Sequence, residues 1–288
     1  MNEQGLKDRL QAISKEKDIP FNECWKKLLL ERFLSRLSRS TCTQQFIFKG
    51  GFLLAYIMEI GRETTDLDFL LTSINASEGE IKKAIEEIIA IESEDGFSFS
   101  YEGIELLEQP HMDYPGYRVS LKATFGRMKD KIQIDVGIGD VVTPTTRELH
   151  LFKYRGKPMF EGEISLVVYP PETIFAEKLE TVLSKGAANS RMKDYHDLIL
   201  LAREPHIINV NKLQVSIKNT FSNRGTSLEL IDFKEDELKP MEKLWVAHLK
   251  NLSNSGQELK LPENIQDVIT EINKILKNIV SQSSNFID

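Results

Sequence analysis

The chain has 288 residues, of which 41% are hydrophobic and 28% charged, and its formal net charge is −7. These proportions are typical of a globular protein with one large domain or two modest ones. The acidic balance argues against a protein that coats nucleic acid non-specifically. The N-terminus is polar and no apolar run is long enough to span a membrane, so we expect a cytoplasmic protein with no membrane partner. Cys24 and Cys42 form no CxxC pair, which favours free thiols in a reducing compartment.

The first 169 residues mix helical and strand patterns. Apolar residues at helical spacing predict helices at residues 22–37, 52–60 and 78–92. Alternating or aromatic-rich runs predict strands at residues 44–49, 67–71, 97–106, 117–125, 131–139 and 164–169. This order predicts an α+β fold, in which helices flank a mixed sheet.

The pattern changes after Pro170 and Pro171. The remaining chain carries helical patterns at residues 171–186, 191–204, 212–221, 241–251 and 262–280. We therefore predict two domains: an α/β core with an N-terminal helix at residues 1–169, and a mostly helical region at residues 170–288.

Two aspartates stand one residue apart in the otherwise apolar strand at 67–71. Side chains two apart on a strand point to the same face, so Asp66 and Asp68 should lie together while Leu67 and Phe69 enter the core. Burying two unpaired carboxylates is costly, and one or two hard cations would compensate for it. Two Mg²⁺ ions held in this way are the usual arrangement for phosphoryl and nucleotidyl transfer.

A third carboxylate would help to hold two cations. In the pattern KIQIDVGIGD, Ile132, Ile134 and Val136 share one face of a strand, while Asp135 stands on the other. We predict Asp135 as the third metal ligand, with Asp140 as the less favoured alternative at the end of the strand.

A glycine pair, Gly50 and Gly51, joins the strand at 44–49 to the next helix. Glycines let the backbone approach a ligand closely, and the N–H groups at the start of a helix favour an anion such as a triphosphate. For a lone Gly-Gly, a plain tight turn is the favoured interpretation. The Asp-x-Asp that follows makes phosphate binding the more specific interpretation.

Together these motifs resemble the nucleotidyltransferase superfamily, with its polymerase-β-like sheet. Lys49, Gly50 and Gly51 form K-G-G, and the stretch from Arg62 reads R-x-T-T-D-L-D-F. This spacing is similar to that of the AbiEii/AbiGii toxin-type branch. The E-K-L helix containing Lys178, the R-x-K-D-x-x-D-L stretch containing Asp194, and MEKLWVAHL near the C-terminus resemble the later motifs of that branch.

The resemblance implies roles for individual residues. Asp66, Asp68 and Asp135 would hold the metal, and the helical region would complete the active-site cleft. Lys178 would contact nucleotide phosphates and Asp194 would be required for activity. Further nucleotide-binding positions implied in this way are Lys49, Gly50, Gly51, Arg62, Thr65 and Lys193.

The resemblance also implies a biological setting. It is the toxin half of a bacterial type IV toxin–antitoxin pair, associated with abortive infection, whose partner is an AbiEi-like antitoxin encoded nearby. The expected cofactor is Mg²⁺ or Mn²⁺, the substrate is a nucleoside triphosphate such as GTP, and one acceptor is the 3′ end of tRNA. Two alternatives stay open: a transferase that modifies a small molecule or a protein, and a non-catalytic nucleotide-binding relative.

The helical positions have simpler interpretations as well. Without the family resemblance, a structural ion pair is the favoured interpretation for Lys178 and Asp194. Lys193 and Asp197 are four residues apart and could form a surface pair. His196, beside Asp197, is expected to face solvent or to contact another helix, because the five histidines show no metal-binding spacing.

Overall fold

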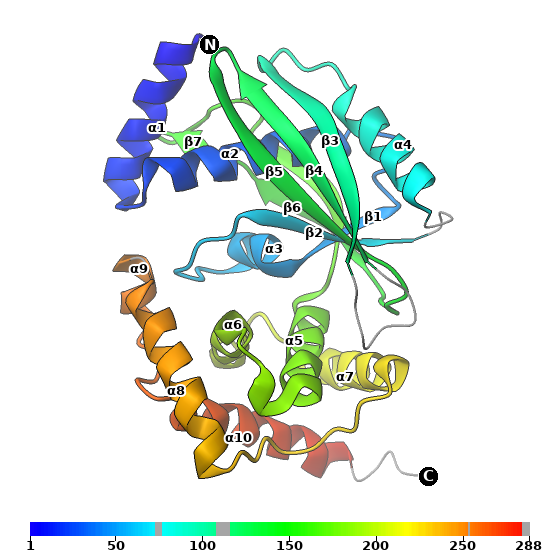
Figure 1. Cartoon of the computed structure of the whole chain (residues 1–288), viewed down its shortest axis with the longest axis vertical. Coiled ribbons are helices and arrows are strands. Elements are labelled where there is room, and N and C mark those ends of the chain that lie inside the picture. Colours follow the sequence, from blue (N-terminus) through cyan, green and yellow to red (C-terminus); the bar gives the residue numbers. More distant parts are fainter. Residues whose placement is uncertain (73–76, 108–115, 253, 284–288) are drawn as a thin grey trace. The chain divides into compact units, whose positions relative to one another are not determined.

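Seven strands form one mixed sheet in the computed structural model, which describes residues 1–72, 77–107, 116–252 and 254–283 (Figure 1). Their order across the sheet is β3-β4-β5-β2-β1-β9-β6. The strands are β1 (Phe46–Lys49), β2 (Asp66–Leu71), β3 (Phe97–Leu107), β4 (Gly116–Phe125), β5 (Met128–Gly137), β6 (Thr145–His150) and β9 (Glu163–Val168). The β2–β5 and β1–β9 pairs are parallel and the other pairs are antiparallel. A separate ribbon pairs β7 (Lys153–Tyr154) with β8 (Lys157–Pro158).

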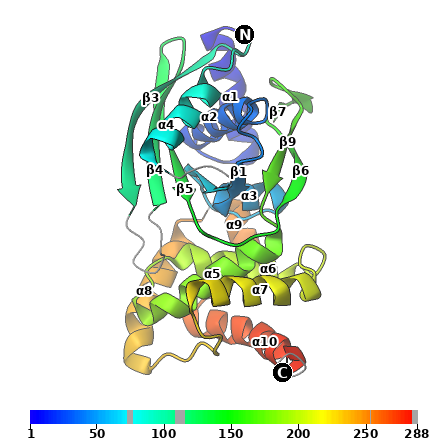
Figure 2. The ribbon, with the colours of Figure 1, turned by 90° about the vertical axis from the view of Figure 1, so that its right-hand side faces the viewer.

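Helices cover one face of this sheet because that face is apolar. Phe33 of α2 (Phe21–Leu37) packs its ring against Phe69 of β2 and Phe99 of β3. The helix α4 (Glu78–Ile89) packs beside α2 on the same side (Figure 2) and buries Ile81, Ala84, Ile85 and Ile88. The helix α1 (Glu3–Lys17) packs on α2, and α3 (Gly50–Ile57) joins β1 to the loop before β2.

The chain divides into two compact units. The sheet unit comprises Met1–Tyr56, Glu63–Asp140 and Pro144–Tyr169. The helical unit comprises Ile57–Arg62, Val141–Thr143 and Pro170–Asp288. Its elements are α5 (Pro171–Lys185), the 3₁₀ turn Gly186–Ala188, α6 (Met192–Arg203), α7 (Val210–Arg224), α8 (Glu235–Lys250), α9 (Asn254–Glu258) and α10 (Ile265–Ser283).

The short segment Ile57–Arg62 belongs to the helical unit because of close backbone contact. Gly61 has φ of +58°, and a Cβ there would lie 2.1 Å from the Cα of Gly256 in α9. Only two glycines allow the two backbones to approach this closely. The residues just before β2 are therefore anchored by helices that come much later in the chain.

The α+β fold class with a mixed sheet is confirmed, and the predicted helices and strands are present. The sequence analysis does not predict β6 or α1. β6 is an edge strand whose residues are exposed except for Leu149, so it lacks the alternation that marks a half-buried strand. α1 shows Leu6, Leu10 and Ile13 at helical spacing, a signal that its many charged residues obscure. No helix within the described ranges is long and apolar enough to cross a membrane.

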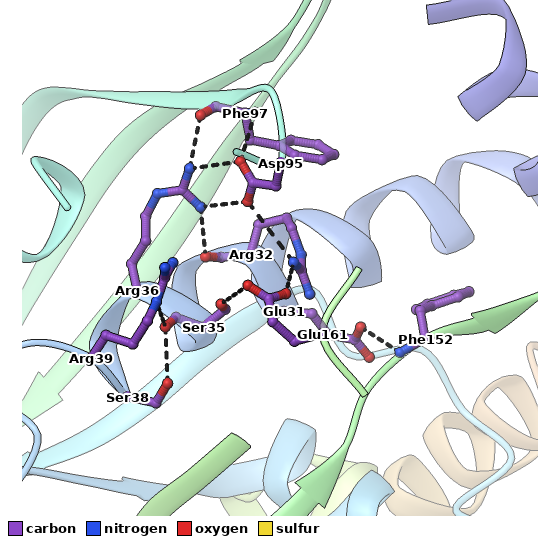
Figure 3. A network of polar contacts seen from close by, with 10 residues as sticks. All are labelled: Glu31, Arg32, Ser35, Arg36, Ser38, Arg39, Asp95, Phe97, Phe152 and Glu161. Carbon is purple, nitrogen blue, oxygen red and sulfur yellow. Dashed lines mark hydrogen bonds and ion pairs between the residues drawn. The ribbon is translucent and has the colours of Figure 1, made fainter. Parts of the chain in front are cut away.

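Buried charges tie α2 to the surrounding loops (Figure 3). Arg36 is 2% exposed and forms two hydrogen bonds to the carboxylate of Asp95, at 2.9 and 3.0 Å, and a third to the carbonyl oxygen of Phe97. Arg32 forms an ion pair with Glu161, whose carboxylate also accepts a bond from Ser35. A buried guanidinium must keep its carboxylate partner, because an uncompensated charge in the core is strongly destabilising.

We predict that Asp95→Ala lowers the free energy of unfolding of the sheet unit by about 3–5 kcal/mol, because it leaves the guanidinium of Arg36 buried without its partner. Trp25 stacks on Phe97 at 6.0 Å and reports on this region. Trp245 lies in the other unit, so the measurement is urea unfolding followed by fluorescence in a Trp245→Phe background. The matched control is Glu86→Ala, which removes the exposed Lys82–Glu86 pair and should change stability by less than about 0.5 kcal/mol. Equal effects of the two substitutions would contradict the prediction.

Candidate functional site

The two aspartates of β2 lie on the face of the sheet opposite the apolar core. Leu67 and Phe69 are fully buried, whereas Asp66 and Asp68, which alternate with them, are partly exposed. Cross-strand pairing continues this polar face onto β5, where Asp66 is opposite Gln133 and Asp68 is opposite Asp135. The strand pattern therefore places the two carboxylates together, as strand periodicity predicts.

The carboxylate of Asp68 packs directly on the backbone of Gly50. Gly50 begins α3 with φ of +76°, and a Cβ at this position would lie 2.0 Å from Oδ2 of Asp68. No side chain can occupy that space while Asp68 keeps its position. Glycine is needed here both for the left-handed backbone and for the close approach of the carboxylate.

A row of charged residues crosses four neighbouring strands at this position. Arg118 of β4 is opposite Asp135 of β5, which is opposite Asp68 of β2, which is opposite Lys49 of β1. Directly opposed residues of neighbouring strands share a face and are close enough to interact. The row thus has two carboxylates in the middle and a cationic side chain at each end.

Asp135 is engaged by the arginine of this row. Arg118 donates from Nε to Oδ1 and from Nη2 to Oδ2 of Asp135, both at 2.7 Å. This hydrogen bonding raises the pKa of Arg118 above its ordinary value, and the negative charges of Asp135 and Asp66 act in the same direction. Bidentate pairs of this kind are among the stronger charge-assisted contacts in proteins.

Lys49, at the other end of the row, contacts Asp140 and Tyr169. Its Nζ donates to Oδ2 of Asp140 at 3.2 Å and lies 4.8 Å from the centre of the Tyr169 ring. Asp140, the alternative to Asp135 in the sequence analysis, is therefore held by a lysine.

Some, but not all, of the three predicted carboxylates are suitable ligands for a hard cation. The carboxylate oxygens of Asp66 and Asp68 are suitable ligands for Mg²⁺. In the described part of the chain, no group of three or more His, Cys, Asp or Glu side chains has the arrangement of a metal site. Since both oxygens of Asp135 already accept hydrogen bonds from Arg118, its role as third ligand stays a prediction.

The predicted residues of the helical unit form a buried ionic network of their own. Nζ of Lys178 on α5 lies 3.0 Å from Asp194 and 2.7 Å from Asp197, both on α6. Arg62 contacts both oxygens of Asp197, at 2.8 and 2.6 Å. Burial opposes the charged form of Lys178, but Asp197 and Asp194 outweigh it and raise its pKa. Burial likewise opposes the charge of Asp197, and Lys178 and Arg62 hold its pKa well below the usual range.

Three simpler expectations for this region have clear outcomes. The structural ion pair between Lys178 and Asp194 is confirmed. The surface pair between Lys193 and Asp197 is wrong, because Asp197 is fully buried against Lys178 and Arg62 while Lys193 is exposed. The expectation that His196 either faces solvent or contacts a helix is confirmed in its second form, since the buried ring contacts α8.

His196 and His248 form a hydrogen-bonded pair beside this network. Nε2 of His196 lies 2.8 Å from the carbonyl oxygen of Ile60, so this nitrogen must carry the proton and donate. With its proton on Nε2, His196 accepts at Nδ1 from Nε2 of His248 at 2.8 Å. Burial lowers the pKa of His196 to about 4 and also lowers the pKa of His248, whose ring stacks on Trp245.

The remaining nucleotide-binding positions of the sequence analysis are placed as follows. Gly51 lies in the first turn of α3, and Thr65 is exposed immediately before β2. Arg62 forms an ion pair with Asp197 in the helical unit.

Arg118, which the sequence analysis does not single out, is found only through its strand register. The only sequence signal for it is a charged residue alternating with the buried positions of β4, a pattern that every half-exposed strand shares.

A Gly-Gly turn that enters a helix, beside an Asp-x-Asp strand in a mixed sheet, defines the class of protein: this chain is a nucleotidyltransferase. Solved structures with this fold are similar to it. JHP933 from Helicobacter pylori has a TM-score of 0.51 at 14% sequence identity, covering 92% of this chain and 94% of that one. A putative nucleotidyltransferase from H. pylori has a TM-score of 0.47 at 16% identity, covering 94% and 100%. At 14% identity the likeness to JHP933 concerns the fold alone.

The sequence itself identifies the family. Residues 32–271 match the family described as "Nucleotidyl transferase AbiEii toxin, Type IV TA system". The chain belongs to this family, the nucleotidyltransferase toxins of type IV toxin–antitoxin systems, so an antitoxin partner and a nucleotide substrate follow from its membership. No curated protein sequence matches the chain.

We predict that Gly50→Ala destabilises the sheet unit more than Gly156→Ala does, by at least about 1 kcal/mol. Both glycines have φ of +76°, but a Cβ at Gly156 meets nothing within 4 Å. Both variants carry the cost of a left-handed alanine, which is about 1–2 kcal/mol, and only Gly50→Ala also displaces Asp68. Urea unfolding of the two variants measures the difference. Identical losses would show that Asp68 does not depend on the space at Gly50.

We predict that the helical unit loses up to about 3 kcal/mol of stability as the pH falls from about 6.5 to about 4. The pKa of His196 is lower in the folded chain than in the unfolded one, so the unfolded state binds more protons within this window. His196→Gln should be less stable at pH 8 and should show a smaller pH dependence than the parent in this window, because only His248 of the pair still titrates. The measurement is urea unfolding followed by Trp245 fluorescence in a Trp25→Phe background. His206→Gln, at an exposed position, is the control and should keep the parent profile.

Proposed function

We propose that this toxin transfers a nucleoside monophosphate from a nucleoside triphosphate to an acceptor hydroxyl, with Mg²⁺ or Mn²⁺ as cofactor. The observation that carries the proposal is the contact between Asp68 and the backbone of Gly50. It joins Asp68 of the acidic pair to the start of α3, which supports a single site made of the acidic pair and the predicted phosphate-binding turn.

The nucleotide end of this site consists of backbone and cationic groups. The N–H groups at the start of α3 favour the phosphates, and Gly50 leaves the backbone open to close approach. Lys49, at the end of β1, adds positive charge beside Asp68. Asp66 and Asp68 would hold the cation, which when bound supplies positive charge to the triphosphate and to the attacking oxygen.

The reaction exchanges one phosphorus–oxygen bond for another. The acceptor hydroxyl oxygen forms a bond to the α-phosphorus, and the bond from that phosphorus to the bridging oxygen of the pyrophosphate breaks. Pyrophosphate leaves with the electron pair, and the hydroxyl proton is released to water. The residues of the sheet hold the triphosphate and orient it for this displacement.

Lys178 and Asp194, the residues of the later family motifs, belong to the helical unit. Lys178 and Asp194 are bonded to each other, and Lys178 is also bonded to Asp197, so we propose that they act as one charge-balanced group. In this arrangement Asp194 and Asp197 keep Lys178 charged for its predicted contact with the nucleotide. Lys193, which is exposed on α6, is proposed as a further contact with the nucleotide.

The family supports the biological part of the proposal. We propose the 3′ end of tRNA as the acceptor, GTP among the nucleotides, and an AbiEi-like antitoxin as the partner that suppresses toxicity, in a cytoplasmic abortive-infection response. Modification of a protein or a small molecule is an alternative outcome of the same experiment.

The test is incubation of the chain with each α-labelled nucleoside triphosphate, Mg²⁺ and total tRNA. We expect label in RNA, no label from γ-labelled nucleotide, and at least about a hundredfold slower transfer by Asp66→Asn, because catalysis depends on charge held at this position. Asp130→Asn, the same change on a partly exposed part of β5, is the control and should retain activity.

The outcomes separate the alternatives. Label in protein or in a small molecule, but not in RNA, would move the proposal to a different acceptor. Label from the γ-phosphate would indicate phosphoryl transfer instead. Equal activity of Asp66→Asn and the parent chain would falsify the proposed role of the acidic pair.

A further inference from the structure

The charged row of the sheet unit is balanced before any substrate binds. Its two aspartates, Asp68 and Asp135, are flanked by one cationic side chain on each side, Lys49 and Arg118. The formal charges within this row therefore sum to zero. Asp66 lies beside the row on the same face of the sheet, so these five side chains together carry one formal negative charge. Within the row, Arg118 is the cation opposite Asp135, the predicted third metal ligand.

The contact between Arg118 and Asp135 is the specific feature of the row. Both oxygens of Asp135 accept a hydrogen bond from the same guanidinium, at 2.7 Å each. The two residues are directly opposed on β4 and β5, so the strand register holds the pair in place. The side chains are 30% and 20% exposed, which leaves both accessible to a cation and to solvent.

The guanidinium also interacts with Asp66 of β2. Asp66 lies close enough for its charge to raise the pKa of Arg118, along with the contribution from Asp135. By the same interaction, the positive charge of Arg118 opposes the approach of a second cation to these carboxylates. A divalent ion that used Asp135 as a ligand would have to share its oxygens with Arg118 or displace it.

We propose that Arg118 is a built-in counter-ion of Asp135 that competes with divalent cations and so sets the cation affinity of the site. The inference rests on the proposed function, because it assumes that Asp66 and Asp68 hold a cation. With Arg118 in place the cation is held by these two aspartates, and Asp135 becomes an additional ligand only when Arg118 leaves it. Arg118 is thus a positioning residue, acting through Asp135.

An exposed cross-strand ion pair is the alternative explanation for the same contact. Such pairs contribute little to stability, usually below about 1 kcal/mol, and their removal has no effect on cation binding elsewhere. The two explanations therefore differ in metal affinity, a quantity that is measured without any substrate or turnover.

The experiment is titration of the intact chain with Mn²⁺, in which the unbound ion is measured by electron paramagnetic resonance. We expect Arg118→Gln to bind Mn²⁺ about tenfold more tightly than the parent, because a positive charge beside the ligands is removed. Arg118→Lys, which keeps the charge, should stay within about threefold of the parent. Arg127→Gln is the control: it removes the same charge from a side chain that is 95% exposed and far along the β4–β5 hairpin, and it should bind as the parent does. Circular dichroism and urea unfolding establish that each variant is folded.

Three outcomes decide the matter. Tighter binding by Arg118→Gln, lost again in the double variant Arg118→Gln/Asp135→Asn, supports the proposal. Unchanged or weaker binding by Arg118→Gln, in a chain whose Mn²⁺ binding depends on Asp66, overturns the inference and leaves the proposed function standing. Mn²⁺ binding by the parent chain that Asp66→Asn does not reduce overturns the assumed metal site, and with it both proposals.

Discussion

The register between β1, β2, β5 and β4 is the constraint on which the site depends. Because side chains alternate along a strand, a shift of one residue in β2 would turn Asp66 and Asp68 into the core and Phe69 toward solvent. The aromatic packing of Phe69 against Phe33, Phe46 and Phe48 makes such a shift very unfavourable. The apolar face of the sheet therefore holds the polar face in place, and the charged row follows from the packing of the core.

Pairing of opposite charges recurs in the buried parts of both units. Arg36 and Asp95 pair within the sheet unit, and Arg62, Lys178, Asp194 and Asp197 form a network within the helical unit. In each case the ions lie within hydrogen-bonding distance, as burial of charge requires. Lys178 and Asp194, for which a functional role is proposed, are thus also held by structural ion pairs, so a substitution at either residue is expected to affect stability as well.

The sequence predicts the fold class and the acidic pair because both depend on short-range patterns. Strand alternation places Asp66 and Asp68 on one face, and helical spacing identifies most helices. The wrong interpretation, the surface pair of Lys193 with Asp197, came from local helix geometry, which reveals nothing about Arg62 approaching from residues far earlier in the chain. Likewise, the contact of His196 with His248 and Ile60 joins three distant segments, and no spacing rule indicates it.

By itself the sequence determined the class of protein, the glycine turn, the acidic strand and the helical C-terminal region, since local periodicity and motif chemistry suffice for these. Only the tertiary structure decided which charges meet. It paired Asp135 with Arg118, Asp140 with Lys49, and Asp197 with Arg62 and Lys178. The physical reason is that an ion pair depends on a few ångströms between side chains, and those distances are set by strand register and helix packing between segments far apart in the chain.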